Sequence, residues 1–505
     1  IQVSDFVFAL SCGRLYRPPP SANMAVSTPE RSWYNDNLTQ LVLMSFVVFA
    51  GPGMFNSLNS IGLGGDPTLG KILNTALYGT WMLTSSFAPT IVNILGAKWT
   101  LLLGTLGYPV YSLAMYYHQR EWAIAAGVFL GLTAGLLWTA QGQLMMSYPE
   151  KSWVGRFVAI FWGIFNSGAV LGCLMSFSIN LGNSAEGQAA SSGGSALSAT
   201  TYWTFFGIMC CGTALSTLLL PLNRVTRTSA DGVVEFVVAD QTEAVSVKVT
   251  GMALVSQELS RTAKAFKHPT MLLLIPFMFY SNFFYEYHFG IIGVLFNGRT
   301  GSLTAALYWL AQILGSFVLQ CFLDREGVSK ARRMQCSFVG IVLYIAVTWI
   351  FGGYVQYSYG ISDERQALDF AGHARSPLMA MGCLFLWGFV DSFVQVWSYW
   401  IMSQLSDEPE ELACFTAFYK LWQNAGAFVS FLVGLHRSYV LSYWINVALI
   451  TISIFPTFLA IRSVSRGVQG KGEENLDSES EEVQTQSEDV DSESEVVQTQ
   501  AIATV

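Results

Sequence analysis

The sequence predicts an all-α polytopic membrane protein in which twelve transmembrane helices form two six-helix halves. Of its 505 residues, 52% are hydrophobic and 12% are charged, whereas soluble domains carry about 25% charged residues. Apolar runs of about 20 residues, the length of a helix that crosses a bilayer, occur twelve times along the chain. A long polar stretch separates the first six runs from the last six, so each set of six is expected to form one half.

The expected spans lie on both sides of that polar stretch. The first six are residues 38–59, 70–95, 99–117, 121–146, 153–181 and 201–221, and the last six are 271–297, 301–323, 334–355, 376–404, 411–434 and 439–461. The chain then divides into an N-terminal segment (1–37), a first half (38–221), a linker (222–270), a second half (271–461) and a C-terminal tail (462–505). The end of the linker, residues 255–269, has the pattern of a short amphipathic helix.

Both ends of the chain lack the pattern of a folded domain. Residues 1–23 contain three consecutive prolines and only a short apolar patch, so we expect a disordered segment and a natural start at Met24. In the tail, DSESEEVQTQ (477–486) recurs as DSESEVVQTQ (491–500). This tandem has no apolar face and predicts a disordered acidic tail, with either a solubilising or a regulatory role.

The distribution of Lys and Arg predicts the orientation. With both termini cytoplasmic, the inner segments hold nineteen of these residues and the outer segments hold six. Because inner loops of membrane proteins are enriched in Lys and Arg, this ratio predicts an N-in, C-in topology, with a cytoplasmic N-terminal segment and linker. The pattern does not distinguish the plasma membrane from a vacuolar or endosomal membrane.

No constellation typical of an enzyme occurs in the sequence. It contains no GxSxG, HExxH or P-loop motif, and its eight cysteines show neither metal-ligand spacing nor a disulfide framework. We therefore expect no enzymatic activity, no cofactor and no metal site. The basic residues border the inner membrane face, so the sequence predicts the lipid bilayer as a partner and no nucleic acid.

Three segments carry a family resemblance. They are GPGMFNSLNSIGLGG (51–65), LLWTAQGQ (136–143) and YSNFFYEYHFG (280–290). Together they resemble the Unc-ninety-three-like family, the ion channel regulatory protein type of the major facilitator superfamily, and in particular its fungal members, over residues 34–460. The resemblance implies a major-facilitator-like fold. Family members are described as channel regulatory subunits, as trafficking chaperones or as transporters without an assigned substrate.

A second resemblance concerns the loop after the eighth span. Asp324-Arg325 followed by Arg332-Arg333 is similar to the charged loop signature of the superfamily, with an insertion, and is a candidate cytoplasmic gate. The corresponding first-half loop, NILGAKW (93–99), retains only a glycine and a lysine of that signature. This departure argues against a standard sugar or drug transporter.

Four ionisable residues lie inside apolar spans: Glu286, His288, Asp391 and Lys420. A charge at the bilayer centre costs about 2.5–3.5 kcal/mol on insertion scales, so such residues usually face a cavity or a partner. Glu286 shares a helix face with Asn282, four positions earlier, and is a candidate for binding a solute or a coupling proton. His288 points elsewhere and is interpreted as a structural histidine.

The tenth and eleventh spans each carry a polar stripe. Asp391 and Gln395 share one face of the tenth, and Lys420 begins a stripe on the eleventh. We expect a structural ion pair between Asp391 and Lys420, which would leave Glu286 as the free titrating group. Asp391 is also a candidate binding or coupling carboxylate, with Gln395 beside it.

The first half contributes amides but no carboxylate at this depth. Gly51-Pro52-Gly53 interrupts the first span, and Asn56 and Asn59 follow on one face. A broken helix that bears amides is typical of a solute site, although a kink packed on a neighbouring helix would have the same pattern. Gln141 and Asn166 are the other candidate polar contacts on this side.

These observations favour a multi-pass transporter of the major facilitator type. It would move a small solute or ion, with or without coupling to protons, by alternating access about a site at the membrane midplane. The alternative is a non-transporting accessory subunit or trafficking chaperone that holds another membrane protein, such as a channel or receptor. A transporter-derived sensor, which binds a solute without carrying it, is a third hypothesis.

Overall fold

The computed structural model describes residues 31–61, 67–117, 119–180, 199–229, 232–238, 252–372, 375–436 and 438–466. Residues 1–30, residues 230–231 and 239–251 of the linker, and residues 467–505 of the acidic tail lie outside these ranges. The expectations for those segments, including the start at Met24, therefore stay predictions.

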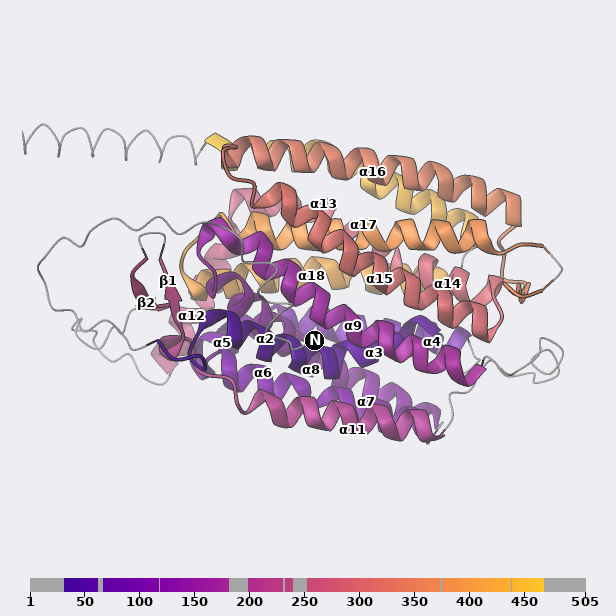
Figure 1. Ribbon diagram of the computed structural model, residues 1–505, viewed down its shortest axis with the longest axis horizontal. Coiled ribbons are helices and arrows are strands. Elements are labelled where there is room, and N and C mark those ends of the chain that lie inside the picture. Colours follow the sequence, from indigo (N-terminus) through magenta and orange to yellow (C-terminus); the bar gives the residue numbers. More distant parts are fainter. Residues whose placement is uncertain are drawn as a thin grey trace, which may run out of the picture.

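Helices occupy all twelve ranges that the sequence predicts (Figure 1). In the first half they are α2 (Asn37–Val48), a π-helical turn η1 (Phe49–Gly53), α3 (Met54–Ile61), α4 (Pro67–Ser85), α5 (Ala88–Leu95), α6 (Ala97–Thr105), α7 (Gly107–Tyr116), α8 (Arg120–Ser147), α9 (Val154–Asn180) and α11 (Ala199–Ser216). In the second half they are α13 (Pro269–Phe283), α14 (Tyr285–Leu295), α15 (Gly298–Leu323), α16 (Lys330–Tyr359), α17 (Leu378–Ser403), α18 (Pro409–Gly434) and a last helix, Tyr439–Arg466.

Seven helices in the described residues are long and apolar enough to cross a membrane, by length and composition. Several of the other expected spans are divided into shorter helices. The breaks fall between α4 and α5, at Leu106 between α6 and α7, and at Phe284 between α13 and α14. The hydropathy of these ranges predicts their position but not the breaks, because a break changes backbone geometry without changing composition.

The two halves lie side by side along their length (Figure 1). In this view the first half, from indigo to magenta, fills the lower part and the second half, from rose to yellow, the upper part. Across the interface α9 packs along α15 and α4 packs along α18. The centre of the bundle is consequently formed by helices from both halves.

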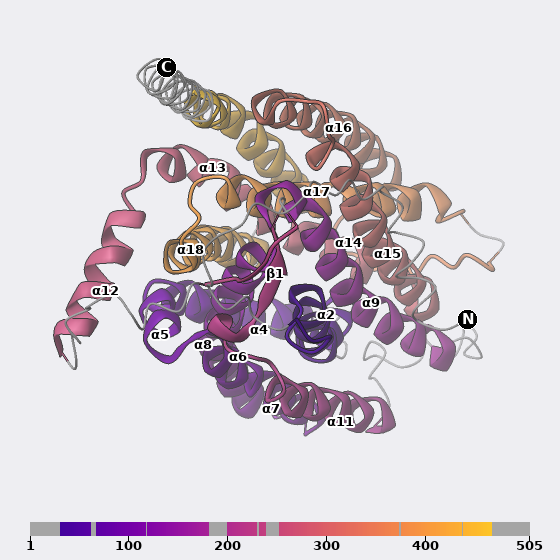
Figure 2. The same cartoon turned by 60° about the vertical axis from the view of Figure 1, so that its left-hand side comes forward.

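The described part of the linker lies at one end of the bundle. It contains a short turn η3 (Leu222–Arg224) and an antiparallel hairpin of β1 (Thr226–Thr228) and β2 (Val234–Phe236), in which Thr226 pairs with Phe236. The expected amphipathic helix is present as α12 (Met252–Ala265), which packs on α5 and α18 at the edge of the bundle (Figure 2). We call this the hairpin end and the opposite one the far end.

The first span is broken where the sequence predicts. Pro52 lies inside η1, and this turn packs against α9 without intervening side chains. A Cβ built on Gly168 would lie 2.5 Å from the carbonyl oxygen of Phe49, and one built on Gly53 would lie 2.8 Å from that of Phe165. Glycine is therefore required at both positions for the two helices to approach.

Adding one methyl group at this contact is expected to destabilise the protein. Gly168→Ala should lower the free energy of unfolding by about 1–3 kcal/mol, because backbone atoms cannot move aside as a side chain would. Thermal unfolding in detergent would measure the loss. Gly207→Ala on α11 is the matched control, since a Cβ there meets nothing within 4 Å. Equal melting temperatures for the two variants would contradict the close contact.

Candidate functional site

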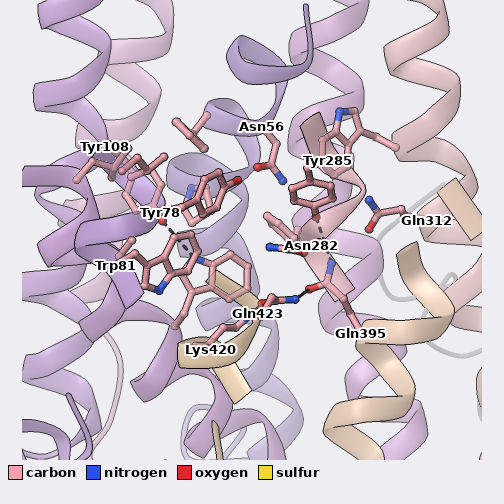
Figure 3. Close-up of a pocket in the computed structure, with 18 residues that line it drawn as sticks. Asn56, Tyr78, Trp81, Tyr108, Asn282, Tyr285, Gln312, Gln395, Lys420 and Gln423 are labelled. Atoms are coloured by element: carbon pink, nitrogen blue, oxygen red, sulfur yellow. Dashed lines mark hydrogen bonds between the residues drawn. The ribbon is translucent and has the colours of Figure 1, made fainter. Parts of the chain in front are cut away.

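A cavity lies at the centre of the bundle between the two halves (Figure 3). Its volume is about 40 Å³, counted as the space open to the centres of water molecules. A water needs roughly 10–15 Å³ on this measure, so the cavity has room for about three. The residues that line it are Pro52, Phe55, Asn56, Leu77, Tyr78, Trp81, Tyr108, Leu130, Ala134, Trp138, Phe165, Asn282, Tyr285, Trp309, Gln312, Gln395, Lys420 and Gln423.

Aromatic rings from the first half form one wall of the cavity. Tyr78 and Trp81 of α4 stack at 5.9 Å, and Trp81 stacks on Trp138 of α8 at 6.0 Å. Trp138 Nε1 donates to the hydroxyl of Tyr108 over 3.2 Å, which fixes its ring. Stacked and hydrogen-bonded rings of this kind give a rigid apolar wall.

Asp391 lies fully buried on α17, just behind the opposite wall. Its carboxylate accepts hydrogen bonds from Gln312 Nε2 and Gln395 Nε2, both at 2.6 Å, from the hydroxyl of Tyr308 at 2.9 Å and from that of Tyr285 at 3.5 Å. Gln312 and Gln395 also line the cavity. The carboxylate thus holds two amides of the cavity wall in place without lining the cavity itself.

Lys420 lines the cavity and reaches Asp391 only through two amides. Its Nζ donates to Gln423 Oε1 over 2.7 Å, Gln423 Nε2 donates to Gln395 Oε1 over 3.0 Å, and Gln395 donates to Asp391. The sequence predicted a direct Asp391–Lys420 ion pair. The structure differs because Gln423 and Gln395 occupy the space between the two charges.

Asn166 connects this network to the first half. Its Nδ2 lies 3.4 Å from Gln312 Oε1, which also accepts from Trp162 Nε1 at 3.2 Å. Both donors belong to α9, whereas Gln312 belongs to α15. Since Gln312 also donates to Asp391, one amide links α9, α15 and α17 at the centre of the interface.

The other predicted polar contacts fall into two groups. Asn56 and Asn282 line the cavity, as expected of binding residues. Asn59 instead accepts from Asn74 on α4 over 2.8 Å, and Gln141 donates to Met145 Sδ within its own helix. These last two contacts fit a packing role better than a binding role.

Glu286 lies at the far end of the bundle, outside the cavity lining. Its Oε1 is 3.0 Å from Lys71 Nζ on α4, and the same Nζ donates to the Gly434 carbonyl over 2.7 Å. The sequence predicted Glu286 to be free. It is paired instead, because the start of α4 brings a lysine of the first half against α14. Its neighbour His288 stacks on Trp387 at 4.4 Å, which agrees with a structural role.

Asp324 joins the two halves at the hairpin end. It caps the N-terminus of α9, where it accepts from the backbone N–H groups of Gly155, at 3.0 Å, and Arg156. Gly155 permits this approach, since a Cβ there would lie 2.5 Å from the carboxylate. Burial raises the pKa of Asp324 to about 6, against the lowering effect of the two N–H groups and of Arg333.

The other residues of the predicted loop gate play smaller parts. Arg333 donates to the Leu323 carbonyl, the backbone N–H of Arg332 donates to the Ser329 side chain, and Arg325 is exposed. Two further contacts cross between the halves nearby: Lys151 contacts Asp407, and Gln143 donates to the Pro409 carbonyl over 2.9 Å. The hairpin end is therefore closed by several polar contacts.

Sequence reasoning missed three of the residues that organise this site. Gln312 lies in the middle of a largely apolar span, whose other amide, Gln320, lies near its end, and that central position was a usable signal. Lys71 lies at the start of a span, where a lysine normally marks the membrane border. Tyr308 gives no signal in the sequence, because a buried tyrosine in a span is usually a packing residue.

The family is shown by comparison with known proteins. The family described as "Ion channel regulatory protein UNC-93" matches residues 70–461. The chain belongs to the UNC-93 family. An UNC93-like protein of Schizosaccharomyces pombe is 35% identical over 408 residues, which cover 79% of this chain and 76% of the relative. UNC93-like protein 1 of Arabidopsis thaliana is 33% identical over 439 residues, which cover 84% of this chain and 90% of the relative.

Solved transporter structures share the fold of this UNC-93 family protein. The proton:xylose symporter XylE from E. coli, of the major facilitator superfamily, superposes with a TM-score of 0.56 at 11% identity. The match covers 85% of this chain and 96% of XylE. The predicted major-facilitator-like fold and the family resemblance are both confirmed, and the protein is an integral multi-pass membrane protein.

The Lys71–Glu286 pair is expected to show strong energetic coupling. Lys71→Met and Glu286→Gln should each lower the free energy of unfolding, because each leaves a buried partner unpaired, and the double variant should recover about 1–3 kcal/mol of the summed loss. Thermal unfolding of the four proteins gives the coupling. The more exposed Arg227–Glu235 pair of the hairpin is the control cycle and should give less than about 1 kcal/mol. Additive losses at Lys71 and Glu286 would contradict the pairing.

Asp324 is expected to make stability fall as pH rises from about 4 to 6. In that window the folded protein, with a pKa near 6, holds a proton that the unfolded chain, with a pKa near 3.8, has released. This group contributes at most about 1.4 kcal/mol per pH unit, fully present below pH 4 and lost above 6. Melting temperatures across this range should decline less in Asp324→Asn. Parallel profiles for the two proteins would disprove the assignment.

Proposed function

We propose that this UNC-93 family protein is a secondary transporter that moves a small solute or ion by alternating access. One observation supports this most: the central cavity is lined by both halves and closed at each end by contacts that cross between them. A site reached from alternate sides as two halves rock about it is the arrangement that such transport requires.

The closing contacts are few and polar at both ends. Lys71–Glu286 joins α4 to α14 at the far end, and Asp324 joins the end of α15 to the start of α9 at the hairpin end. Polar contacts of this kind can exchange for contacts with water when one end opens. We assign the present arrangement to an occluded state, since the cavity holds only about three waters.

A proton could be coupled to transport at Asp391. Four donors converge on its carboxylate, so a protonated form would require either a tyrosine hydroxyl to rotate and accept the new O–H or an amide to turn away. Gln312 and Gln395 both line the cavity, and either movement would alter the cavity wall. Glu286 then acts as part of the far gate rather than as the coupling group. We retain the N-in, C-in topology, which places the hairpin end in the cytoplasm.

The accessory role remains the second candidate. It is favoured by the family's description as an ion channel regulatory protein. It would use the outer helices, such as α16, whose exposed residues include Leu343, Val347 and Ile350. An accessory protein holds its partner without needing the cavity to open, and this difference separates the two functions experimentally.

A reversible cross-link at the far end tests transport directly. The hydroxyls of Ser176 on α9 and Ser302 on α15 lie 3.0 Å apart across the interface. Ser176→Cys with Ser302→Cys should form a disulfide that keeps the far end closed. In proteoliposomes we would measure exchange of a panel of ions, amino acids, sugars, nucleosides and organic acids. Oxidation should abolish exchange of whichever solute is carried, and dithiothreitol should restore it.

The variants with only one of the two substitutions, Ser176→Cys or Ser302→Cys, are the controls. Each should continue to exchange the solute after oxidation. Exchange that continues through the cross-linked protein would contradict alternating access between these halves. No exchange of any solute, together with co-purification of a channel that the cross-link leaves intact, would favour the accessory function.

A further inference from the structure

We infer that the central cavity selects a small organic anion with an apolar body, and that Lys420 binds its charge. This inference rests on the proposed transport function and names the class of solute that such a transporter would carry. It depends on three features of the cavity: its charge, the unfilled hydrogen-bonding capacity of Lys420, and the shape of the walls.

The cavity lining carries one full charge, and it is positive. Among the described residues that line it, Lys420 is the only lysine or arginine, and no aspartate or glutamate is present. Asp391 lies behind the wall, and Glu286 lies at the far end on Lys71. A cationic solute would therefore meet a like charge at the cavity surface, with the carboxylate of Asp391 two amides behind it, whereas an anion would meet its counter-charge directly.

The ammonium group of Lys420 has N–H donors without a hydrogen-bond partner among the described residues. Its ammonium group carries three N–H donors, and within the described part of the chain one of them is used, on Gln423 Oε1. The side chain is 2% exposed, so bulk water does not supply the missing partners. Asp391 cannot supply them either, because four neighbouring donors occupy its oxygens. The acceptors for its remaining N–H groups must therefore come from within the cavity, where a solute would displace water.

Aromatic rings surround the ammonium without replacing that acceptor. Nζ lies 4.5 Å from the centroid of Trp138, 5.1 Å from that of Tyr419 and 5.5 Å from that of Tyr399. Ring faces attract a cation but are weaker acceptors than a carboxylate oxygen. The rings hold the ammonium in position, but they do not supply the charge-assisted hydrogen bond that a carboxylate would supply.

The walls indicate the body of the solute. The rings of Tyr78, Trp81 and Trp138, stacked one against the next, form an apolar aromatic wall of the cavity, and Figure 3 labels Tyr78 and Trp81. Across the cavity Asn282 Oδ1 is buried and has no partner among the described residues. In the present closed state the cavity has room for only about three waters, so such a solute would enter as the two halves part. A carboxylate that carries a ring and a hydroxyl group would then place its charge on Lys420, its ring on the aromatic wall and its hydroxyl on Asn282.

An isosteric pair of probes isolates the charge. 4-Hydroxybenzoate and 4-hydroxybenzamide share ring, hydroxyl and shape, but only the first is an anion. For the wild-type protein in detergent we expect thermal stabilisation by the acid at concentrations at least about tenfold lower than by the amide, since a charge-assisted bond replaces a neutral one. Chloride, titrated separately, supplies an anion without an apolar body and should stabilise the protein less than the acid.

Substitutions then test whether Lys420 causes the preference for the acid over the amide. Lys420→Gln should remove the preference for the acid, and Lys420→Arg should retain it. Lys264→Gln on the exposed face of α12 is the matched control and should behave as wild type. If Lys420→Gln does not fold, the wild-type comparison of acid with amide and the Lys420→Arg variant still decide the question.

The outcomes separate this inference from the proposed function. Equal stabilisation by acid and amide, stabilisation by chloride alone, or no stabilisation by either probe would overturn the anion assignment. In that case, exchange of neutral solutes in proteoliposomes would still support the proposed transport function. Binding of the acid through Lys420 without any exchange would support the anion site and contradict transport.

Discussion

The carboxylate of Asp391 is the group on which the centre of the molecule depends. A charge at this depth is tolerated only with partners, and Asp391 finds four of them on α14, α15 and α17. One partner, Gln312, also contacts α9 of the other half. The need to satisfy one buried charge thereby fixes the relative positions of the helices that form the cavity.

The carboxylates at the two ends of the bundle are stabilised by different kinds of partner. At the far end a lysine of the first half meets Glu286 of the second, and at the hairpin end Asp324 uses the N–H groups at the start of α9. A helix N-terminus carries partial positive charge and unpaired donors, so it can replace a basic side chain. The two ends are therefore closed by unlike contacts of similar polarity. This suits a molecule in which one end must open while the other stays closed.

The sequence predicted the fold well and the pairings poorly, for one physical reason. Hydropathy is a local property, so the positions of the helices and the break at Pro52 could be read from neighbouring residues. Pairing depends on which helices lie side by side. Glu286 was expected to be free because its partner, Lys71, is far away in the sequence and sits where a lysine usually marks the membrane border. Asp391 and Lys420 were expected to pair directly, and the two glutamines between them could be located only in three dimensions.

The order of the two amide groups between Lys420 and Asp391 would couple binding of a solute to protonation of Asp391. A cation at one end requires an amide oxygen, and a carboxylate at the other requires an amide N–H, so both Gln423 and Gln395 must point the same way. Reversing either amide would set donor against donor at one of the charges. An anion that binds Lys420 competes with Gln423 for the ammonium and weakens the constraint on this orientation. Gln395 would then be freer to leave Asp391, and a solute in the cavity and a proton at the carboxylate would influence each other through two side chains.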